Sequence, residues 1–418
     1  MPDPVLTAED RAMLEGERGG AAAFAMRILV EMARVWEAER LIDITSAHID
    51  SCLYHGRAGL DFAERLAEGG ARVVVPTTLD VSSLDLLHPE LVRLDAATSA
   101  NARRLMDGYV AMGCRPTWTC APYQLPERPG FGEHVAWAES NAIVFANSVL
   151  GARTNRYGDF IDICAAITGR APLAGLHLDA NRRATMVFRL EGVPHRLLHD
   201  EVTPTCVGHI LGKEAGRQVA AIVGLPADTG EDRLKALGAA AASSGAVAMF
   251  HAVGVTPEAP TLDAALGGEP PGREVVVTPG RLRAARDELT TVPDGPIGAV
   301  SVGTPHLSRA ELEKLSALVA DTPPVVPFYA NTGRDFSEGT HTALADAGVT
   351  VVTDTCTYIT PIIHDIDGPV MTNSAKWAWY APANLGFDVV FGSLEECVRS
   401  AALGHIWRDP ELWGASGA

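Results

Sequence analysis

Short apolar stretches that end in polar clusters recur along this chain of 418 residues, and helical patterns separate them. Leu41–Ile44 runs into a cluster between residues 46 and 56 that holds two histidines, an aspartate and a cysteine. The stretch 71–76 ends at two threonines and follows the helical pattern of residues 59–69. This alternation predicts parallel or mixed sheets covered by helices. Because strand ends carry the chemistry of such sheets, we expect the polar clusters to form the functional site.

The second half of the chain repeats the order of strand, polar loop and helix. Val349–Thr353 leads into Cys356, and 369–371 leads into the polar residues 372–376. The composition changes near residue 225. We therefore expect two α/β regions, 1–225 with a Cys120 loop and 226–418 with a Cys356 loop, and leave open whether their subdomains interleave.

Two helix starts carry a capping-box signature, in which a hydroxyl residue is followed three positions later by an acid. Thr7 precedes Asp10 in this way, and Ser308 precedes Glu311. Helices are expected to begin directly after each hydroxyl residue.

The acidic composition argues against a nucleic-acid binder. The chain has 34 Lys and Arg against 52 Asp and Glu, a net charge of -18, whereas phosphate neutralisation needs clustered bases. No stretch approaches the roughly 20 apolar residues of a membrane span, and residues 1–4 do not resemble the start of a signal peptide. Seven cysteines, scattered without disulfide-like spacing, fit a reducing compartment. We expect a cytoplasmic protein without membrane or nucleic-acid partners.

Cys120 and Cys356 are the strongest metal-ligand candidates, because each follows a threonine in a polar loop after a regular element. Thiolates bind soft iron and hold iron–sulfur clusters. A lone cysteine is more often a packing residue, and Cys164, Cys206 and Cys397 fit that alternative. The absence of any CxxC pair requires that ligands come from distant loops.

Other polar residues have both a functional and a structural interpretation. His48 and His306 are candidate ligands, proton carriers or satisfied core groups. Asn331 to Arg334 suits a substrate carboxylate, or caps a loop. Lys376 lies between Ala375 and Trp377, where an ammonium is either paired and functional or extends to water.

As a set, these stretches resemble the aconitase X family, a divergent branch of the aconitase superfamily. The resemblance rests on Ser46 to Asp50, Thr117 to Tyr123, Trp137 to Ala142, Gly158-Asp159, Phe250-His251, Gly303 to His306, Asp354 to Cys356 and Asn373 to Lys376. It implies an aconitase-like large subunit, with several α/β subdomains around a central cleft. Some members carry a small swivelling domain on the same chain, and this chain looks like the large catalytic subunit of the kind that has it as a separate polypeptide.

The resemblance also implies an iron cofactor. It puts Cys120 and Cys356 at ligand positions, and Thr304 at a position where archaeal-type relatives have a third cysteine. That departure leaves three cofactors open: a [2Fe-2S] cluster, a [4Fe-4S]-derived cluster or mononuclear iron. Cys52, Cys114 or His306 would complete the ligand shell.

The implied activity is a hydro-lyase reaction, in which iron acts as a Lewis acid on a hydroxyl group. We expect dehydration of cis-3-hydroxy-L-proline to Δ1-pyrroline-2-carboxylate, with a serine of the small subunit as the base. Mevalonate 5-phosphate dehydratase is the alternative, and a non-catalytic binding or scaffold subunit is the alternative of another class. The predicted catalytic residues are Lys376, Ser374, His48 and Glu139, and the predicted substrate-binding residues are Asn141, Asn331, Arg334 and Asn373.

Overall fold

The computed structural model describes residues 3–337 and 341–413, and it divides into two compact units. Unit 1 consists of residues 1–84 and 94–183, and unit 2 of residues 85–93 and 184–418. The division at 183/184 differs from the expected change near residue 225. Strands on both sides of residue 225 pair in one sheet of unit 2, which keeps them in one unit.

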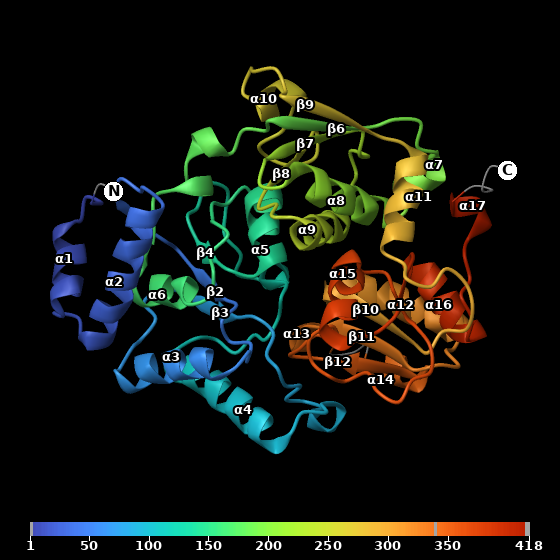
Figure 1. Ribbon diagram of the computed structural model, residues 1–418, viewed down its shortest axis with the longest axis horizontal. Coiled ribbons are helices and arrows are strands. Elements are labelled where there is room, and N and C mark those ends of the chain that lie inside the picture. Colours follow the sequence, from blue (N-terminus) through green and yellow to red (C-terminus); the bar gives the residue numbers. More distant parts are fainter. Residues whose placement is uncertain (1–2, 338–340, 414–418) are drawn as a thin grey trace. The chain divides into compact units, whose positions relative to one another are not determined.

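Unit 1 contains short strands between helices (Figure 1). Its elements are α1 (Ala8–Glu15), α2 (Gly20–Val35), β1 (Leu41–Asp43), β2 (Ala47–Ile49), α3 (Arg57–Glu68), β3 (Thr77–Leu79), α4 (Ala96–Ala111), β4 (Ala136–Trp137), α5 (Ser140–Phe145), α6 (Ile161–Thr168) and β5 (Arg170–Pro172). A π-helical turn, 146–150, continues α5. The strands β3, β2 and β4 form a parallel sheet in that order, and β1 pairs with β5 antiparallel.

The strand expected over residues 71–76 lies elsewhere. Strand β3 begins at Thr77, and the three valines before it are half-buried or exposed, with Val74 56% exposed. The apolar run indicated a buried strand, but Pro76 lacks a backbone N–H and the ladder with β2 starts only after it. The polar threonines therefore belong to the strand itself.

Unit 2 contains two parallel sheets (Figure 1). The first has the order β8-β7-β6-β9, and Figure 1 shows α8 and α9 together on one side of it. Its elements are β6 (Met186–Leu190), α7 (His195–His199), α8 (Val202–Ala215), β7 (Ala220–Val223), α9 (Glu231–Ser244), β8 (Phe250–Ala252), α10 (Leu262–Leu266), β9 (Arg273–Val277) and α11 (Pro279–Glu288).

The second sheet of unit 2 has the order β12-β11-β10-β13-β14. Its elements are β10 (Ala299–Leu307), α12 (Arg309–Asp321), β11 (Phe328–Thr332), α13 (Arg334–Ser337), α14 (His341–Asp346), β12 (Val349–Val352), β13 (Val370–Thr372), α15 (Ala375–Leu385), β14 (Val389–Phe391), α16 (Leu394–Leu403) and α17 (Pro410–Trp413). The central strand β10 is buried along its whole length, which is typical of a parallel sheet covered on both faces.

Both capping boxes are confirmed: Thr7 caps α1 with Asp10, and Ser308 caps α12 with Glu311. A larger apolar core in unit 2 packs α12 and α16 against β10, with Leu312, Leu315 and Val398 among its buried members. Within the described residues, no helix has the length and apolar character needed to cross a membrane. The chemistry-bearing loops thus extend from the ends of well-packed parallel strands.

Candidate active site

Three parallel strands of unit 1 carry a buried acid or imidazole on them or just after them. His48 lies on β2, Asp80 directly follows β3, and Glu139 follows β4 and caps α5. All three side chains are buried. Because the carboxyl ends of parallel strands meet at one edge of a sheet, the register brings these groups together.

His48 is a neutral imidazole. One ring nitrogen is hydrogen-bonded within the described residues and the other is not. Its Nδ1 lies 2.8 Å from Thr78 Oγ1 on the neighbouring strand. Its Nε2 lies 3.8 Å from Asp80 Oδ1, and neither of these two atoms has a hydrogen-bond partner among the described residues. Complete burial lowers the pKa of His48 to about 4, so the ring is uncharged at neutral pH. The pair is placed to receive hydrogen bonds from a small polar ligand.

Asp50 and Asp80 form a carboxyl pair that holds a proton. Burial raises the pKa of both, and the pKa of Asp50 is raised further by the charge of Asp80 and by the hydrogen bond between the two side chains. Two carboxyl groups in such contact cannot both be ionised, because the hydrogen bond requires a proton and like charges repel. Asp50 therefore carries the proton, and Asp80 accepts the hydrogen bond that Asp50 donates.

The Cys120 loop is tied to the strand ends of the same sheet. Thr117 Oγ1 accepts from the Leu79 N–H at 3.0 Å and donates to the Leu79 carbonyl at 2.8 Å. The Cys120 carbonyl accepts from Asn141 Nδ2 at 2.9 Å. Asn141 also donates to Glu139 and accepts from the Tyr123 hydroxyl. The side chain of Asn141, a predicted substrate-binding residue, thus links the thiol loop to the start of α5.

Glu139 is held in one orientation by its capping role. One oxygen accepts from the Ala142 N–H at 2.8 Å, and the other accepts from Ser140 Oγ at 3.0 Å. A carboxylate at a helix N-terminus is stabilised in its charged form. Glu139 therefore supplies a fixed negative charge beside His48, and this charge partly opposes the burial that lowers the pKa of that histidine.

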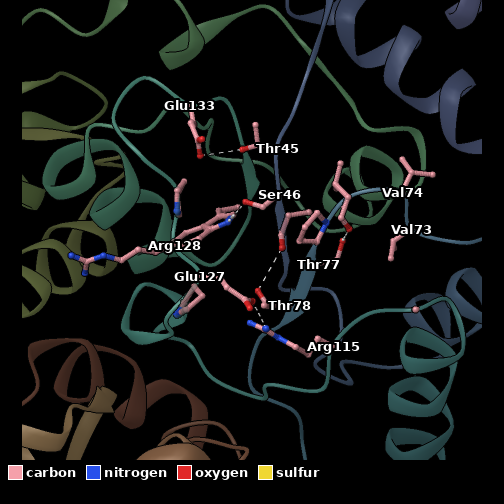
Figure 2. Close-up of a pocket in the computed structure, with 17 residues that line it drawn as sticks. Thr45, Ser46, Val73, Val74, Thr77, Thr78, Arg115, Glu127, Arg128 and Glu133 are labelled. Atoms are coloured by element: carbon pink, nitrogen blue, oxygen red, sulfur yellow. Dashed lines mark hydrogen bonds and ion pairs between the residues drawn. The ribbon is translucent and has the colours of Figure 1, made fainter.

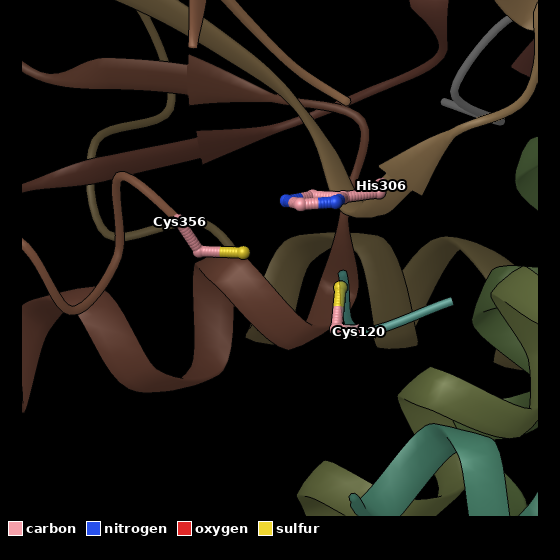
Figure 3. A group of neighbouring side chains, drawn as sticks. All are labelled: Cys120, His306 and Cys356. Atoms are coloured by element: carbon pink, nitrogen blue, oxygen red, sulfur yellow. The ribbon is translucent and has the colours of Figure 1, made fainter. Parts of the chain in front are cut away.

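In unit 2, His306 of β10 and Cys356 of the loop after β12 come together. The ligand atoms of the two side chains lie within 4.8 Å of one another. His306 Nε2 donates to the Thr355 carbonyl at 3.0 Å, because a carbonyl only accepts. Its Nδ1 consequently carries the lone pair that a metal needs, which is the arrangement usual for metal-bound histidines. Figure 3 draws these two side chains with Cys120, the loop cysteine of unit 1.

The backbone beneath His306 allows little variation. Gly303 has φ +91°, and a Cβ there would lie 2.3 Å from the Asn331 carbonyl oxygen. Lys235 Nζ donates to the His306 carbonyl at 3.3 Å and pairs with Glu311 and Asp232. Burial opposes the charge of Lys235, but the two carboxylates raise its pKa overall. The ammonium is thus retained in a buried site.

Thr304 is buried next to this imidazole and ends in an unsatisfied hydroxyl. Its Oγ1 has no hydrogen-bond partner in the described parts of the chain, and its carbonyl accepts from Ser374 Oγ. A neutral hydroxyl is a much poorer ligand for iron than a thiolate. The imidazole nitrogen and the Cys356 sulfur of unit 2 do fit an iron centre, because both are donors that iron commonly takes.

Two of the predicted substrate-binding residues make structural bonds in unit 2. Asn331 Nδ2 donates to the Val302 carbonyl at 2.7 Å, and its Oδ1 accepts from the Thr357 N–H at 3.1 Å. Arg334 makes two bonds to Asp354, at 2.8 and 2.6 Å. Both residues therefore hold the Cys356 loop, and their expected contact with a substrate stays a prediction.

Lys376, Ser374 and Asn373 gather at the start of α15. They line a small cavity of about 30 Å³ that Thr304 and Lys235 also line. Ser374 caps the helix by accepting from the Trp377 N–H at 3.1 Å. Lys376 is buried, with its ammonium 5.6 Å from the centre of the Tyr358 ring. Two lysines, Lys235 and Lys376, therefore line the cavity at this end of β13.

Sequence reasoning did not single out Asp80, Thr78, Lys235 or Glu311 as site residues. The signal for Asp80 was present, since it stands one residue after a strand end, but the strand was expected earlier in the chain. The burial of Lys235 depends on tertiary packing, and no local pattern in this alanine-rich helix distinguishes a buried lysine from an exposed one.

Comparison with known proteins finds relatives over nearly the whole chain. Three family models match the chain: the aconitase X first domain over residues 3–180, the second over 184–287 and the third over 297–403. The chain is 45% identical over 412 residues to a cis-3-hydroxy-L-proline dehydratase of Pseudomonas aeruginosa, covering 96% of this chain and 70% of that protein. A protein of the same name from Hypocrea jecorina is 41% identical, with 96% and 69% covered.

More distant relatives correspond to this chain over nearly their whole length. A phosphomevalonate dehydratase large subunit of Methanothermobacter thermautotrophicus is 36% identical, with 93% of this chain and 97% of that protein covered. The crystal structure of holo aconitase X from Thermococcus kodakaraensis matches with a TM-score of 0.84 at 31% identity, covering 95% of this chain and all of that one. The chain therefore belongs to the aconitase X family.

Proposed function

We propose that this chain is the large subunit of a hydro-lyase that dehydrates cis-3-hydroxy-L-proline. The observation that carries the proposal is its 45% and 41% identity to two proteins named for that activity. The large subunits named for phosphomevalonate dehydration are 32–36% identical. The polar groups at the strand ends of unit 1 and unit 2 support a reaction on a small, hydroxylated acid.

We assign the metal to Cys120, His306 and Cys356. When bound, iron would supply Lewis acidity for the departure of a hydroxyl group. The donor set of two thiols and one imidazole suits mononuclear iron or a small iron–sulfur cluster. Thr304, at the position of a third cysteine in some relatives, is not assigned as a ligand, because a neutral hydroxyl competes poorly for iron. The Nδ1 lone pair of His306 supports its inclusion.

The chain's own residues would manage the protons of the reaction. Dehydration removes a proton from Cα, breaks the C3–O bond and adds a proton to the departing oxygen to give water. We assign that last proton to the Asp50–Asp80 pair, with His48 Nε2 positioning the hydroxyl. The enamine that results tautomerises to Δ1-pyrroline-2-carboxylate. Lys376 and Asn373 are assigned to the substrate carboxylate, and Ser374 positions this turn through its bond to Thr304.

The base for the Cα proton is assigned to a serine of a small partner subunit. Relatives that match over nearly their whole length are named large subunits, which supports a partner of this kind. The dehydratases with higher identity extend beyond the matched region, since the chain covers 69–70% of them. We propose a cytoplasmic location, because no disulfide joins the seven cysteines, all of which lie in the described residues.

The test is co-expression with a candidate small subunit, anaerobic purification, iron and sulfide analysis, and assay of both substrates. We expect turnover of cis-3-hydroxy-L-proline and none of mevalonate 5-phosphate. The reverse preference would overturn the substrate assignment and favour the second candidate, which the coverage of 97–99% of the archaeal large subunits supports. Colourless, iron-free protein that is inactive on both would favour a non-catalytic subunit.

A further inference from the structure

A segment from early in the sequence belongs to unit 2. Residues 85–93 are part of this unit, whereas the residues on either side of them belong to unit 1. We call residues 85–93 the strap. The Arg93 N–H donates to the Pro361 carbonyl at 2.9 Å, and Pro361 lies in the loop between β12 and β13. Cys356 lies in the same loop, so the strap is hydrogen-bonded to the segment that carries an assigned metal ligand.

Asp85 joins the strap to this loop with a completely buried carboxylate. Its Oδ1 accepts from the Leu87 N–H at 2.9 Å and from the His88 N–H at 2.8 Å, which closes a turn within the strap itself. Its Oδ2 accepts from the Thr353 N–H at 2.9 Å, and the Thr353 hydroxyl donates to Oδ1 at 3.0 Å. One carboxylate thus orders the strap and holds a residue three positions before Cys356.

The strap also holds Asp354, the next residue of the loop. Asp354 has φ +62°, in the left-handed region that residues other than glycine rarely adopt. Its carboxylate accepts from the Leu86 N–H at 3.1 Å and from Arg334 at 2.8 and 2.6 Å. Such a conformation persists where the surrounding structure holds it. Leu86 and Arg334 therefore fix the direction in which the chain approaches Cys356.

Each of the three residues before Cys356 is thus held by a partner that is distant in sequence. The strap holds the first two, and His306 holds the third by donating to the Thr355 carbonyl at 3.0 Å. The Cys356 carbonyl accepts from the Thr360 N–H at 3.0 Å, which closes a turn after the thiol. A ligand loop that the protein fixes in this way loses little conformational entropy when it binds a metal.

We propose that Asp85 is a positioning residue for the metal centre, and that it presents the Cys356 thiol by holding Thr353. This role rests on the proposed function, in which Cys356 binds the metal. Asp85 is not suited to bind the metal itself, because N–H donors occupy both of its oxygens. It is not suited to contact a substrate either, because its complete burial leaves no surface for one.

Asp85→Asn breaks the bond between strap and loop selectively. The asparagine oxygen can still accept from Leu87 and His88, but its NH2 group then faces the Thr353 N–H, and two donors cannot bond to each other. Thr353→Val is a milder second variant, because it removes the hydroxyl bond and keeps the N–H bond. Asp95→Asn is the matched control. Asp95 accepts from two backbone N–H groups at the start of α4 in unit 1, where asparagine caps a helix equally well.

The first readout needs no metal. It is the rate at which iodoacetamide alkylates Cys356 in the full-length chain after chelator treatment, measured by peptide mass spectrometry. Cys397, which is completely buried in the same unit, is the internal reference. We expect the rate at Cys356 to rise at least tenfold in Asp85→Asn and at least threefold in Thr353→Val, because a buried thiol reacts through local opening. The rate at Cys397 should stay at the wild-type value, and Asp95→Asn should change neither rate.

An unchanged rate at Cys356, or an equal rise at Cys397, would show that Asp85 does not position this loop specifically and would reject the proposal.

The second readout is the affinity of the same chains for iron(II) under anaerobic conditions. Partners that orient metal ligands typically contribute roughly 10–100-fold to metal affinity, and we expect a loss of that size in Asp85→Asn and none in Asp95→Asn. Wild-type affinity in Asp85→Asn would reject the positioning role alone and leave the proposed function intact. A wild-type chain that binds no iron would instead reject the metal assignment of the proposed function, and the role of Asp85 with it.

Discussion

His306 Nε2 donates a hydrogen bond to the carbonyl oxygen of Thr355, 3.0 Å away, and Thr355 immediately precedes Cys356. One bond therefore sets the tautomer of the imidazole and holds the loop of the neighbouring thiol. Ring orientation and thiol position cannot change independently, which favours a preorganised pair of donors. The following predictions separate the two roles of this histidine and test the groups around it.

His306→Gln should lose iron while the protein keeps its fold. The glutamine amide can replace Nε2 as the donor to Thr355, but it offers no lone pair at the position of Nδ1. We expect iron content per chain to fall at least tenfold, with a change in melting temperature of no more than a few degrees. Iron analysis and thermal unfolding measure the two effects. Full iron loading in this variant would remove His306 from the ligand set.

Cys120→Ala and Cys356→Ala should each abolish iron binding and turnover. The proposed ligand set is two thiols and one imidazole. Loss of either sulfur would leave the metal with only two protein ligands. Cys164→Ala and Cys397→Ala are the matched controls, one in each unit, because both are fully buried cysteines on helices. We expect the controls to retain iron. Wild-type activity in either loop variant would contradict the ligand assignment.

Asp50→Asn should remove a pH dependence from stability. The pKa of Asp50 is raised in the folded chain, so its proton stabilises the fold at low pH, and that contribution is lost as pH rises through the folded pKa. Asparagine donates the same hydrogen bond to Asp80 without titrating. The variant should therefore be less stable or equal at pH 5 and relatively more stable at pH 9. Melting temperatures measured across this range check the sign.

The same substitution should reduce turnover, because asparagine cannot release a proton to a departing hydroxyl. We expect kcat to fall by about 10² or more, the usual size of a general-acid effect, with a smaller change in KM. Asp61→Asn, at an exposed carboxyl of α3 that pairs with Arg57, is the control and should leave kcat with cis-3-hydroxy-L-proline within twofold. An unchanged kcat for Asp50→Asn would show that the carboxyl pair is structural.

Lys235→Met should destabilise unit 2 by about 3 kcal/mol, because it leaves the half-buried carboxylates of Glu311 and Asp232 without their partner. Lys235 is 3% exposed in its side chain and Glu311 is 24% exposed. The double variant Lys235→Met/Glu311→Gln should recover much of that loss, since only the more exposed Asp232 then keeps an unpaired charge. Denaturant unfolding of the two variants measures the difference. Equal instability of both would show that packing, and not charge, is responsible.

Much of the fold could be predicted from local patterns. The capping boxes at Thr7 and Ser308 mark helix starts because their hydrogen bonds join residues three positions apart. The helical pattern of residues 59–69, which ends at a glycine, is likewise local, and the observed α3 matches it within a few residues. The family itself could be inferred from short motifs, and the three matching domain models confirm it.

The partners of the site residues could not be predicted, because they depend on which strands pair. Asp80 meets Asp50 and His48 only through the register of β2 and β3. The strand was expected over residues 71–76, but β3 begins at Thr77. Asp80 therefore lies at a strand end that the sequence pattern did not predict. Similarly, Arg334 suggested a carboxylate partner, and in the structure it holds Asp354 of the chain itself, while its contact with a substrate stays a prediction. A guanidinium in a sequence does not reveal whether its partner is internal.

The brevity of β2 has a consequence for engineering this protein. A strand of three residues, at about 3.3 Å per residue, is only about 10 Å long, so residues at its two ends lie close together. Libraries that vary Thr78 to change substrate range would therefore also change a residue that lines the cavity of about 580 Å³ in unit 1 (Figure 2). The same substitutions would remove the hydrogen bond between Thr78 and His48, so one position serves both ends of the strand.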